Sequence, residues 1–488
     1  MAYLKQLLKN CNYMCLQGNL DRKVTDICYD STKVKKGSMF VCLSGQYRDG
    51  HEYISEAVKR GAAICLVQKG VVVPENVTVI RVQNTRAALA VIAADYYGRP
   101  AKKLHIIGIT GTKGKTSTAY MVWNILKEAG YRAGLIGTLG LQLDETCTPF
   151  YNTTPESLVI QHCLRKMVDE GYEYCVMEVS SQGLKNHRVD EIIFDIGVFT
   201  NISPDHIGPG EHADFAEYLR CKSRIFEKSR IGIVNIDDKF ARKAALRCGG
   251  RIRTYGIHTQ ADYQALDIQY TKFVDCLGMS YRLRGTMVCA MELGMPGIYN
   301  VYNSLAAIAV CHTVGVPDGA FSKALRSIQV RGRIEEIPMP GEYRLLIDYA
   351  HNAVSLENLL STLRFYQPGR IVTLFGCGGN RSKLRRFQMG EVAGKLSDFT
   401  ILTSDNPRFE KPEDILTDIE TGMKKTQGSY IRITDRREAI AYAIEHAKKD
   451  DLIVLAGKGH EDYQEINGKL YPMDERDIIN EIVRQYHS

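Results

Sequence analysis

No stretch of this sequence holds about 18 consecutive apolar residues, the length that a membrane-spanning helix needs. A charged segment followed by an apolar one, the pattern of a signal peptide, is also missing near the start. The first residues, MAYLKQLLKNCNYM, have the spacing of an amphipathic helix instead. We therefore expect no membrane span and a cytoplasmic protein.

Cysteine pairs of the C-x-x-C type are absent, although the chain has 14 cysteines. Scattered cysteines favour reduced thiols and give no zinc-binding pattern. The net charge is +7, but basic residues alternate with acidic ones along the whole chain and form no single run. This distribution favours anionic small molecules as ligands and argues against a nucleic-acid partner.

The length of 488 residues predicts about three domains of roughly 150 residues each. Gly98-Arg99-Pro100 breaks the chain once, and a second break is expected near residues 330–333, before a turn-rich segment. The predicted domains are 1–100, 101–332 and 333–488. We expect the protein to be a monomer.

Apolar strands alternate with amphipathic helices from residue 104 onward, which predicts parallel sheets with helical crossovers. Strands are expected at 106–109, 174–178, 195–200 and 231–235, and again at 344–347, 371–375, 399–403 and 452–455. Before them, strands at 38–43 and 77–82 precede a helix at 85–97. The predicted fold class is α/β with three domains: a smaller N-terminal α/β domain, a central P-loop-type doubly wound parallel sheet, and a C-terminal Rossmann-like domain.

The last four predicted strands each run into a polar loop: DYAHN, GCGGNR, SDNPR and AGKGHED. Ligands of open α/β sheets bind beyond the carboxyl ends of the strands. We therefore expect these four loops to face one site.

Residues 104–117, LHIIGITGTKGKTS, form an apolar strand, a glycine-rich turn and the start of a helix. Such a turn holds nucleotide phosphates, with Lys115 on the β and γ oxygens and Thr116 on Mg²⁺. An ordinary P-loop would need glycine at 109, where this chain has Ile109. The segment predicts ATP binding with an unusual glycine spacing.

The SDNPR loop has the chemistry of a site for an amino acid. Pro407 favours an extended Asn406, so the chain should leave the strand without starting a helix. Arg408 can offer its planar fork to a carboxylate, while Asp405 and Asn406 can accept from an ammonium group. A surface turn is the simpler alternative for this loop alone.

Taken together, the motifs resemble those of the Mur ligase family and in particular its MurE branch, which adds the third amino acid to the cytoplasmic peptidoglycan precursor. The resemblance rests on GTKGKTS (111–117), NTT (152–154), MEVSSQGL (177–184), DYAH (348–351), GCGGNR (376–381), DNPR (405–408) and GKGHED (457–462). It implies that ATP phosphorylates a substrate carboxylate and that an amine then displaces the phosphate from the acyl phosphate.

The resemblance also implies that residues 1–100 form a UDP-substrate-binding domain, residues 101–332 an ATP-binding domain and residues 333–488 an amino-acid-binding domain. It implies the site residues as well. The catalytic group would be Lys115, Glu178, His206 and Lys222. The Mg²⁺ ligands would be Thr116, Glu178, His206 and Lys222, the lysine as a carbamate. ATP would be held by Gly111, Thr112, Lys113, Gly114, Lys115, Thr116, Ser117, Asn300, Asn303, Arg333 and Asp348.

The other two substrates have implied sites of their own. The UDP-MurNAc-dipeptide would be held by Ser31, the loop 45–51, Asn152, Thr153, Thr154, Ser180 and Arg188. The incoming amino acid would be held by Arg381, Asp405, Asn406, Pro407, Arg408, Gly457 and Glu461. Some of these assignments have a simpler alternative when the residues are considered without the resemblance. Lys222 would then be a solvated surface lysine, residues 152–154 would form a turn, and Asn300 or Asn303 would be a helix cap.

DNPR favours meso-diaminopimelate as the amino acid, because a lysine side chain offers no carboxylate to Arg408. Several positions depart from the pattern of such enzymes, namely Lys113, Gln182 and Ala353, and the segment 205–215 resembles a form found in lysine-adding relatives. A lysine- or ornithine-adding enzyme and a folylpolyglutamate synthetase are therefore alternatives. A P-loop nucleic-acid ATPase and a catalytically dead relative that binds the muramoyl-peptide are alternatives of other classes.

Overall fold

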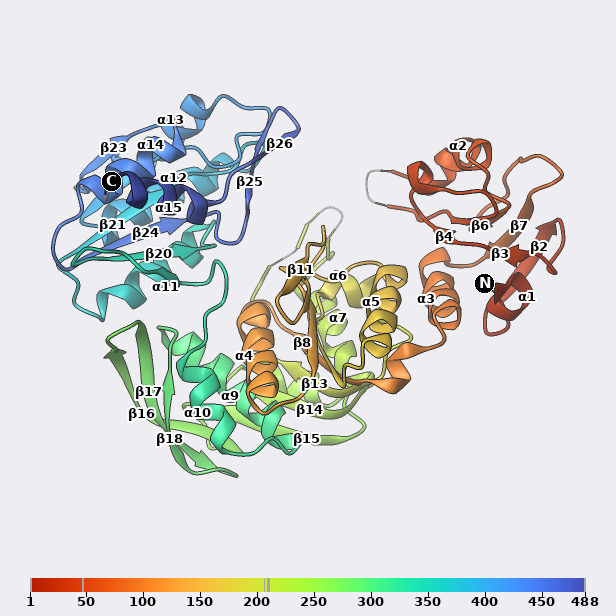
Figure 1. Ribbon diagram of the computed structural model, residues 1–488, viewed down its shortest axis with the longest axis horizontal. Helices are drawn as coiled ribbons and strands as arrows, with labels where there is room; N and C mark the ends of the chain where they lie inside the picture. The colour runs from red at the N-terminus through yellow and green to blue at the C-terminus, as the bar shows by residue number, and fades with distance from the viewer. Residues whose placement is uncertain (1, 46–47, 206, 209–210, 487–488) are drawn as a thin grey trace. The chain divides into compact units, whose positions relative to one another are not determined.

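The computed structural model describes all residues except 1, 46–47, 206, 209–210 and 487–488 (Figure 1). By their internal contacts the residues form two compact units, each described by itself below. The first unit comprises Met1–Gln264, Arg284–Met287 and Tyr302–Ala324, and the second comprises Ala265–Leu283, Val288–Val301 and Leu325–Ser488. The α/β class is confirmed, while the division into three domains stays a prediction.

A five-stranded sheet near the N-terminus has the order β2-β7-β6-β5-β4. Its strands are β2 (Tyr13–Gln17), β4 (Ile27–Cys28), β5 (Met39–Val41), β6 (Ile64–Val67) and β7 (Thr78–Val82). Helix α3 (Thr85–Tyr96) follows, and the Asn84 side chain caps it by accepting from Arg86 N at 2.9 Å. The predicted helix and both predicted strands of this region are confirmed to within two residues.

The amphipathic helix predicted over the first residues was wrong beyond one short turn. Helix α1 covers Leu4–Leu7, where both leucines are buried, and Tyr13–Gln17 form strand β2. Strand β2 pairs antiparallel with β7 at the edge of the sheet. This long-range pairing overrides the local helical spacing.

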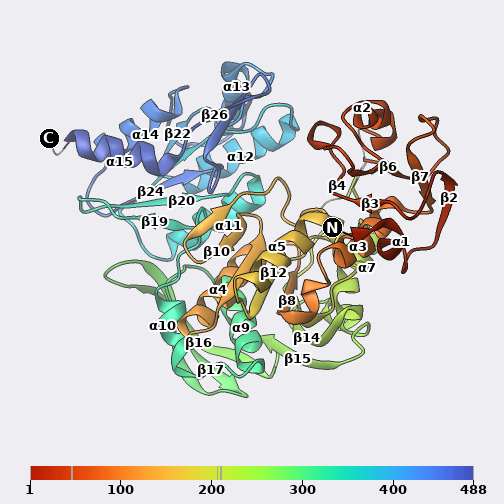
Figure 2. The ribbon, with the colours of Figure 1, turned by 45° about the vertical axis from the view of Figure 1, so that its right-hand side comes forward.

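An eleven-stranded sheet has the order β11-β10-β9-β12-β8-β13-β14-β15-β16-β17-β18. Its parallel strands are β8 (His105–Thr110), β9 (Ala133–Gly137), β12 (Tyr174–Glu178), β13 (Phe194–Phe199), β14 (Ser229–Asn235) and β15 (Arg251–Gly256), and the start of β16 (Tyr263–Lys272) pairs parallel with β15. Helix α4 (Lys115–Glu128) follows β8 and packs against β9 and β12 (Figure 2). All four strands predicted here are confirmed, because strands buried on both faces read as continuous apolar runs.

Three further helices of this region carry candidate residues or lead to them: α5 (Ser157–Asp169), α6 (Ser181–Lys185) and α7 (Phe215–Glu227). Helix α9 (Ile298–Thr313) carries the two predicted asparagines. Among the helices that the structure describes, none has both the length and the apolar character that crossing a bilayer requires.

The second unit contains a six-stranded sheet of order β19-β20-β24-β21-β22-β23. The strands are β19 (Glu335–Ile337), β20 (Arg344–Asp348), β21 (Arg370–Phe375), β22 (Phe399–Leu402), β23 (Tyr430–Arg432) and β24 (Asp451–Ala456). Only β19 is antiparallel to its neighbour. Helices α14 (Arg436–Glu445) and α15 (Glu475–Tyr486) cover one face through a shared apolar core. The four strands predicted for this part are confirmed.

Three further groups of strands were not predicted. They are β10 (Gly140–Leu143) with β11 (Thr146–Thr148), the ribbon of β16 (Tyr263–Lys272), β17 (Leu277–Gly285) and β18 (Cys289–Leu293), and the hairpin of β25 (Tyr463–Ile466) and β26 (Lys469–Pro472). Asn467 and Gly468, with φ of 50° and 72°, form the two-residue turn of the last hairpin. That hairpin brings Glu465 to the amino-acid loops described below.

Candidate active site

The phosphate loop lies between β8 and α4. Gly111 and Gly114 have φ of 151° and 82°. A Cβ on Gly111 would lie 1.9 Å from Thr200 Oγ1, and one on Gly114 would lie 2.3 Å from Asn303 Oδ1. The off-register glycines are therefore required by the close approach of the loop to its neighbours, and α4 begins directly behind them, with its N-terminal dipole and N–H groups suited to an anion.

Two lysines donate to the same loop carbonyl. Lys115 Nζ lies 2.9 Å from Gly111 O, and Lys222 Nζ lies 2.7 Å from the same oxygen. Lys222 comes from α7, is only 2% exposed and lies 4.8 Å from the centre of the Tyr218 ring. Burial, and next the charge of Lys115, hold the pKa of Lys222 well below its usual range. The reading of Lys222 as a solvated surface residue was wrong.

Glu178 ends β12 as a fully buried carboxylate. Its Oε2 accepts from Thr116 Oγ1 at 2.9 Å and from Thr138 Oγ1 at 3.1 Å, and its Oε1 accepts from Thr138 N at 2.8 Å. A carboxylate beside hydroxyl oxygens is a donor set that Mg²⁺ prefers, so the residues present fit this ion. His206, the other predicted ligand, lies outside the described residues.

Sequence reasoning missed Thr138. It follows strand β9, which pairs with β12 in the parallel sheet. A Cβ on the preceding Gly137 would lie 2.3 Å from Glu178 Oε1, so the carboxylate packs directly on this turn. Thr138 could have been predicted from the expectation that the ends of β9 and β12 lie side by side in the parallel sheet.

Four of the predicted muramoyl-peptide residues gather beside Glu178. Thr153 Oγ1 lies 3.1 Å from Thr138 Oγ1, and Thr154 Oγ1 donates to Glu178 O at 2.9 Å. Ser180 N donates to Thr154 Oγ1, and Arg188 donates to Thr154 O, both at 2.9 Å. The NTT and SSQGL segments therefore form one cluster.

Glu156 was also missed. It accepts from Arg188 Nε at 3.0 Å and from Arg86, in the first turn of α3, at 2.5 Å. Glu156 therefore connects the predicted Arg188 to Arg86 of the N-terminal region.

Two other residues were predicted for the same substrate. Asn152 is exposed, and Ser31 donates to Glu56 at 2.8 Å.

The two predicted asparagines of α9 are buried. Asn300 Nδ2 donates to Pro296 O at 2.8 Å, in the first turn of the helix, while Asn303 Oδ1 accepts from Thr118 Oγ1 at 3.3 Å. Both asparagines lie inside α9, so neither has the position of a cap; Asn300 ties the first turn of the helix to Pro296, and Asn303 connects to the phosphate-loop helix.

Asp348 accepts a hydrogen bond from the backbone next to residues 330–333, where the second domain boundary was predicted. Its oxygens accept from Ile334 N and Ala350 N, both at 2.8 Å, and burial raises the pKa of its carboxyl group. The Arg333 guanidinium lies 4.9 Å from the centre of the Tyr349 ring. Both predicted residues therefore belong to one local structure.

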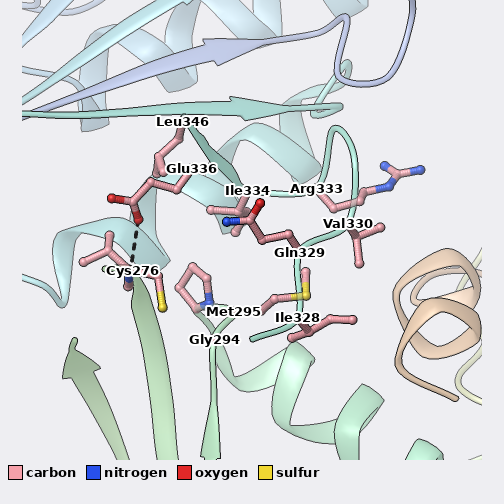
Figure 3. Close-up of a pocket in the computed structure, with 12 residues that line it drawn as sticks. Cys276, Gly294, Met295, Ile328, Gln329, Val330, Arg333, Ile334, Glu336 and Leu346 are labelled. Carbon is pink, nitrogen blue, oxygen red and sulfur yellow. Dashed lines mark hydrogen bonds between the residues drawn. The ribbon is translucent and has the colours of Figure 1, made fainter. Parts of the chain in front are cut away.

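A small hollow lies beside this segment, between β17, the end of β18 and residues 328–334 (Figure 3). Its lining is mostly apolar, and Leu277 N donates to Glu336 across it at 3.3 Å. Burial raises the pKa of Glu336. The hollow lacks the convergent polar groups of a substrate site.

The four polar loops of the second unit do meet at one edge, because β20, β24, β21 and β22 are successive parallel strands. Asn406 O accepts from Gly379 N at 2.9 Å, and Asn406 Nδ2 donates to Glu461 Oε2 at 2.8 Å. Gly457, with φ of 108°, packs against Asp405, whose Oδ2 lies 3.0 Å from where a Cβ would stand. The predicted gathering of these loops is confirmed.

Arg408 leaves the strand in a non-helical loop after Pro407, as predicted. Its Nη1 donates to Gly379 O at 2.8 Å, and its Nε donates to Glu465 Oε2 at 2.9 Å. Arg381 is exposed at the same edge. Glu465 was missed because only the β25–β26 hairpin brings it to the loop.

Comparison with known proteins agrees with this arrangement. Family models match at residues 23–97 (Mur ligase family, catalytic domain), 109–311 (Mur ligase middle domain) and 332–459 (Mur ligase, glutamate ligase domain). The chain is 42% identical to a UDP-N-acetylmuramoyl-L-alanyl-D-glutamate–2,6-diaminopimelate ligase of Caldanaerobacter subterraneus subsp. tengcongensis, over 99% of both chains. It is 38% identical to the ligase of that name from Clostridium perfringens, over 98% of this chain and 99% of that one.

Solved structures show the same fold. A UDP-N-acetylmuramoyl-L-alanyl-D-glutamate–2,6-diaminopimelate ligase matches with a TM-score of 0.70 and 27% identity, over 100% of this chain and 99% of that one. MurF from Acinetobacter baumannii matches with a TM-score of 0.67 and 19% identity, over 99% and 98%. Together with the family models and the full-length relatives, these matches show that the chain belongs to the Mur ligase family.

Proposed function

We propose that this chain is an ATP-dependent ligase that joins meso-diaminopimelate to the D-glutamate of UDP-MurNAc-L-Ala-D-Glu through an acyl phosphate. The observation that carries the proposal is the four-loop edge, where the fork of Arg408 stands beside the Asn406–Glu461 pair. The guanidinium can bind a carboxylate and the Glu461 carboxylate can bind an ammonium group, so together they suit one zwitterionic end of this amino acid. Full-length relatives named for the same reaction support it.

ATP is held in this proposal by residues 111–117, with Lys115 on the phosphates. Thr116 and Glu178, with His206 and Lys222 as its carbamate, would hold Mg²⁺, which when bound neutralises charge on the transferred phosphoryl group. The buried position of Lys222 against Gly111 supports its place at the phosphates. Asn300, Asn303, Arg333 and Asp348 complete the proposed ATP site.

The muramoyl-peptide is held in this proposal by Thr153, Thr154, Ser180 and Arg188, with Ser31 and Asn152 as further contacts. The cluster beside Glu178 supports this assignment, because it places hydroxyl and guanidinium groups next to the proposed phosphoryl-transfer centre. Its role is to orient the carboxylate that is phosphorylated, which is the main task of a site without a protein nucleophile.

The incoming amino acid is held in this proposal by Arg381, Asp405, Asn406, Pro407, Arg408, Gly457 and Glu461. Phosphate leaves when the amine attacks the acyl phosphate. Three domains with boundaries near 100 and 332, a monomeric state, a cytoplasmic location and small molecules as the partners are parts of the same proposal.

L-lysine is the second candidate for the amino acid, favoured by the segment 205–215. One experiment separates the two. Purified protein with Mg²⁺, ATP and UDP-MurNAc-L-Ala-D-Glu receives meso-diaminopimelate, L-lysine or L-ornithine, and phosphate release is measured. We expect release with meso-diaminopimelate. Release with lysine alone would overturn our interpretation of Arg408, and no release with any amino acid would overturn the ligase proposal.

A further inference from the structure

Lys458 is a fully buried lysine in the middle of the GKGHED loop after β24. Its Nζ lies 3.0 Å from Asn406 Oδ1 and 3.1 Å from Glu461 Oε2, and 5.4 Å from the centre of the Tyr463 ring. An ammonium group out of water is unfavourable unless it is paired and hydrogen-bonded. The two polar partners of Lys458 are both residues of the proposed amino-acid site.

The bonds around Lys458 fix the side chain of Asn406. Its Oδ1 accepts from Lys458 Nζ and, at 2.9 Å, from Glu465 N, while its Nδ2 donates to Glu461 Oε2 at 2.8 Å. The amide can therefore adopt only one of its two orientations, since the reverse would place its NH₂ group against the ammonium and the backbone N–H. Lys458 and the backbone N–H of Glu465 together decide that the NH₂ group of Asn406 faces Glu461.

The same bonds act on Glu461. In the part of the chain that the structure describes, Lys458 and Asn406 both donate to Oε2, which leaves Oε1 for the ammonium of a ligand. Glu461 is thus held in place by two donors on one oxygen, with its other oxygen available to a cationic ligand group.

We propose that Lys458 is a positioning residue of the amino-acid site, which holds Asn406 and Glu461 in the orientation that receives the incoming amino acid. The inference rests on the proposed function, because that function makes the two partners part of a substrate site. Lys458 acts through these residues, so its removal alters amino-acid binding and leaves the use of ATP as it was.

The test compares Lys458→Met with Lys395→Met in the full-length protein. Methionine keeps the length of the side chain and removes the charge, while Lys395 is an exposed lysine of the same unit, paired with Glu391 on one helix. The Michaelis constants for meso-diaminopimelate and for ATP are measured separately. For Lys458→Met we expect the constant for the amino acid to rise about tenfold or more and that for ATP to change less than about twofold. Lys395→Met changes neither.

A second measurement leaves out the amino acid. Acyl-phosphate formation from ATP and UDP-MurNAc-L-Ala-D-Glu, trapped chemically, should proceed in Lys458→Met as in the wild type. If Lys458→Met does not fold, Lys458→Gln, which keeps an N–H donor and removes the charge, replaces it and should show the same selective loss.

Two results would overturn the inference: unchanged kinetics in Lys458→Met, or an equal rise of the constants for ATP and the amino acid. Either result contradicts the role of Lys458 only if the wild-type protein releases phosphate when an amino acid is added. A wild type that releases none contradicts the proposed function itself, so the two failures are distinguishable.

Discussion

Lys222 Nζ lies 2.7 Å from the carbonyl oxygen of Gly111, so a buried lysine of α7 contacts the first glycine of the phosphate loop. A cation with such low exposure is unfavourable there, and the charge of Lys115 adds to the penalty. A carbamate at this position would convert the amine into an anionic oxygen group beside the phosphate loop.

The first prediction concerns that modification. Protein equilibrated with ¹³C-labelled carbon dioxide should give a carbamate carbon signal by NMR, and Lys222→Ala should lose it. We expect the turnover of Lys222→Ala to fall about 100-fold or more, because one charged group at the phosphates is lost. An active wild type without a carbamate signal would mean that Lys222 works as an unmodified amine.

The second prediction concerns Glu178. Glu178→Gln should weaken Mn²⁺ binding, measured by electron paramagnetic resonance, at least about tenfold, and Thr138→Val should weaken it by about the same factor through the lost hydrogen bond to the carboxylate. Glu170→Gln, which changes an exposed carboxylate on the same unit, is the control. Equal Mn²⁺ affinity in Glu178→Gln and Glu170→Gln would exclude Glu178 as a ligand.

The third prediction concerns Arg408. Lysine can replace its charge but cannot bond both Gly379 O and Glu465 while facing a carboxylate. Arg408→Lys should therefore raise the Michaelis constant for meso-diaminopimelate about tenfold or more, with less than about a twofold change for ATP. Arg364→Lys, on the exposed pair with Asp398, should alter neither constant. Similar changes for both substrates would count against a direct carboxylate contact.

The fourth prediction concerns stability beneath the amino-acid loops. Arg386 is 1% exposed and bonds Glu410 at 2.8 and 2.9 Å and Asp418 at 2.9 Å. Arg386→Met leaves two carboxylates without their buried cation, so we expect a loss of about 3–5 kcal/mol in the free energy of unfolding. Urea denaturation measures it. Lys383→Met, which removes an exposed partner of the same Asp418, should cost about 1 kcal/mol or less.

The fifth prediction concerns pH. Asp237 accepts from the backbone N–H groups of Ile257, His258 and Thr259 and from the Tyr302 hydroxyl, and these bonds outweigh burial and lower its pKa to about 2. Because the folded-state pKa is lowered, the stabilisation is complete above the ordinary value of 3.8 and is lost as the pH falls towards 2.

Asp237→Asn should reduce the free energy of unfolding by about 1–2 kcal/mol at pH 7, with a smaller difference from the wild type at pH 3. Denaturant titrations at the two pH values measure it, with the exposed Asp169→Asn as the control. A difference that is constant between the two pH values would show that the charge of Asp237 does not contribute.

The sequence predicted most of the parallel strands because buried strands are continuous apolar runs, as in β12, whose bounds were predicted without error. It predicted less well where pairing is long-range. Tyr13–Gln17 became a strand through β7, and the ribbon β16–β18 was not foreseen, because neither depends on local spacing alone.

The candidate site divides in the same way. The sequence by itself determined which segments end in glycine, hydroxyl and charged residues, and so the phosphate loop, the four polar loops and Arg408. Only the tertiary structure decided that Lys222 is buried against Gly111, that Thr138 and Glu156 join the predicted residues, and that Glu465 and Lys458 complete the amino-acid loops. The physical reason is that burial and ion pairing depend on which strand ends lie side by side, and strand order is set by long-range packing that no local pattern records.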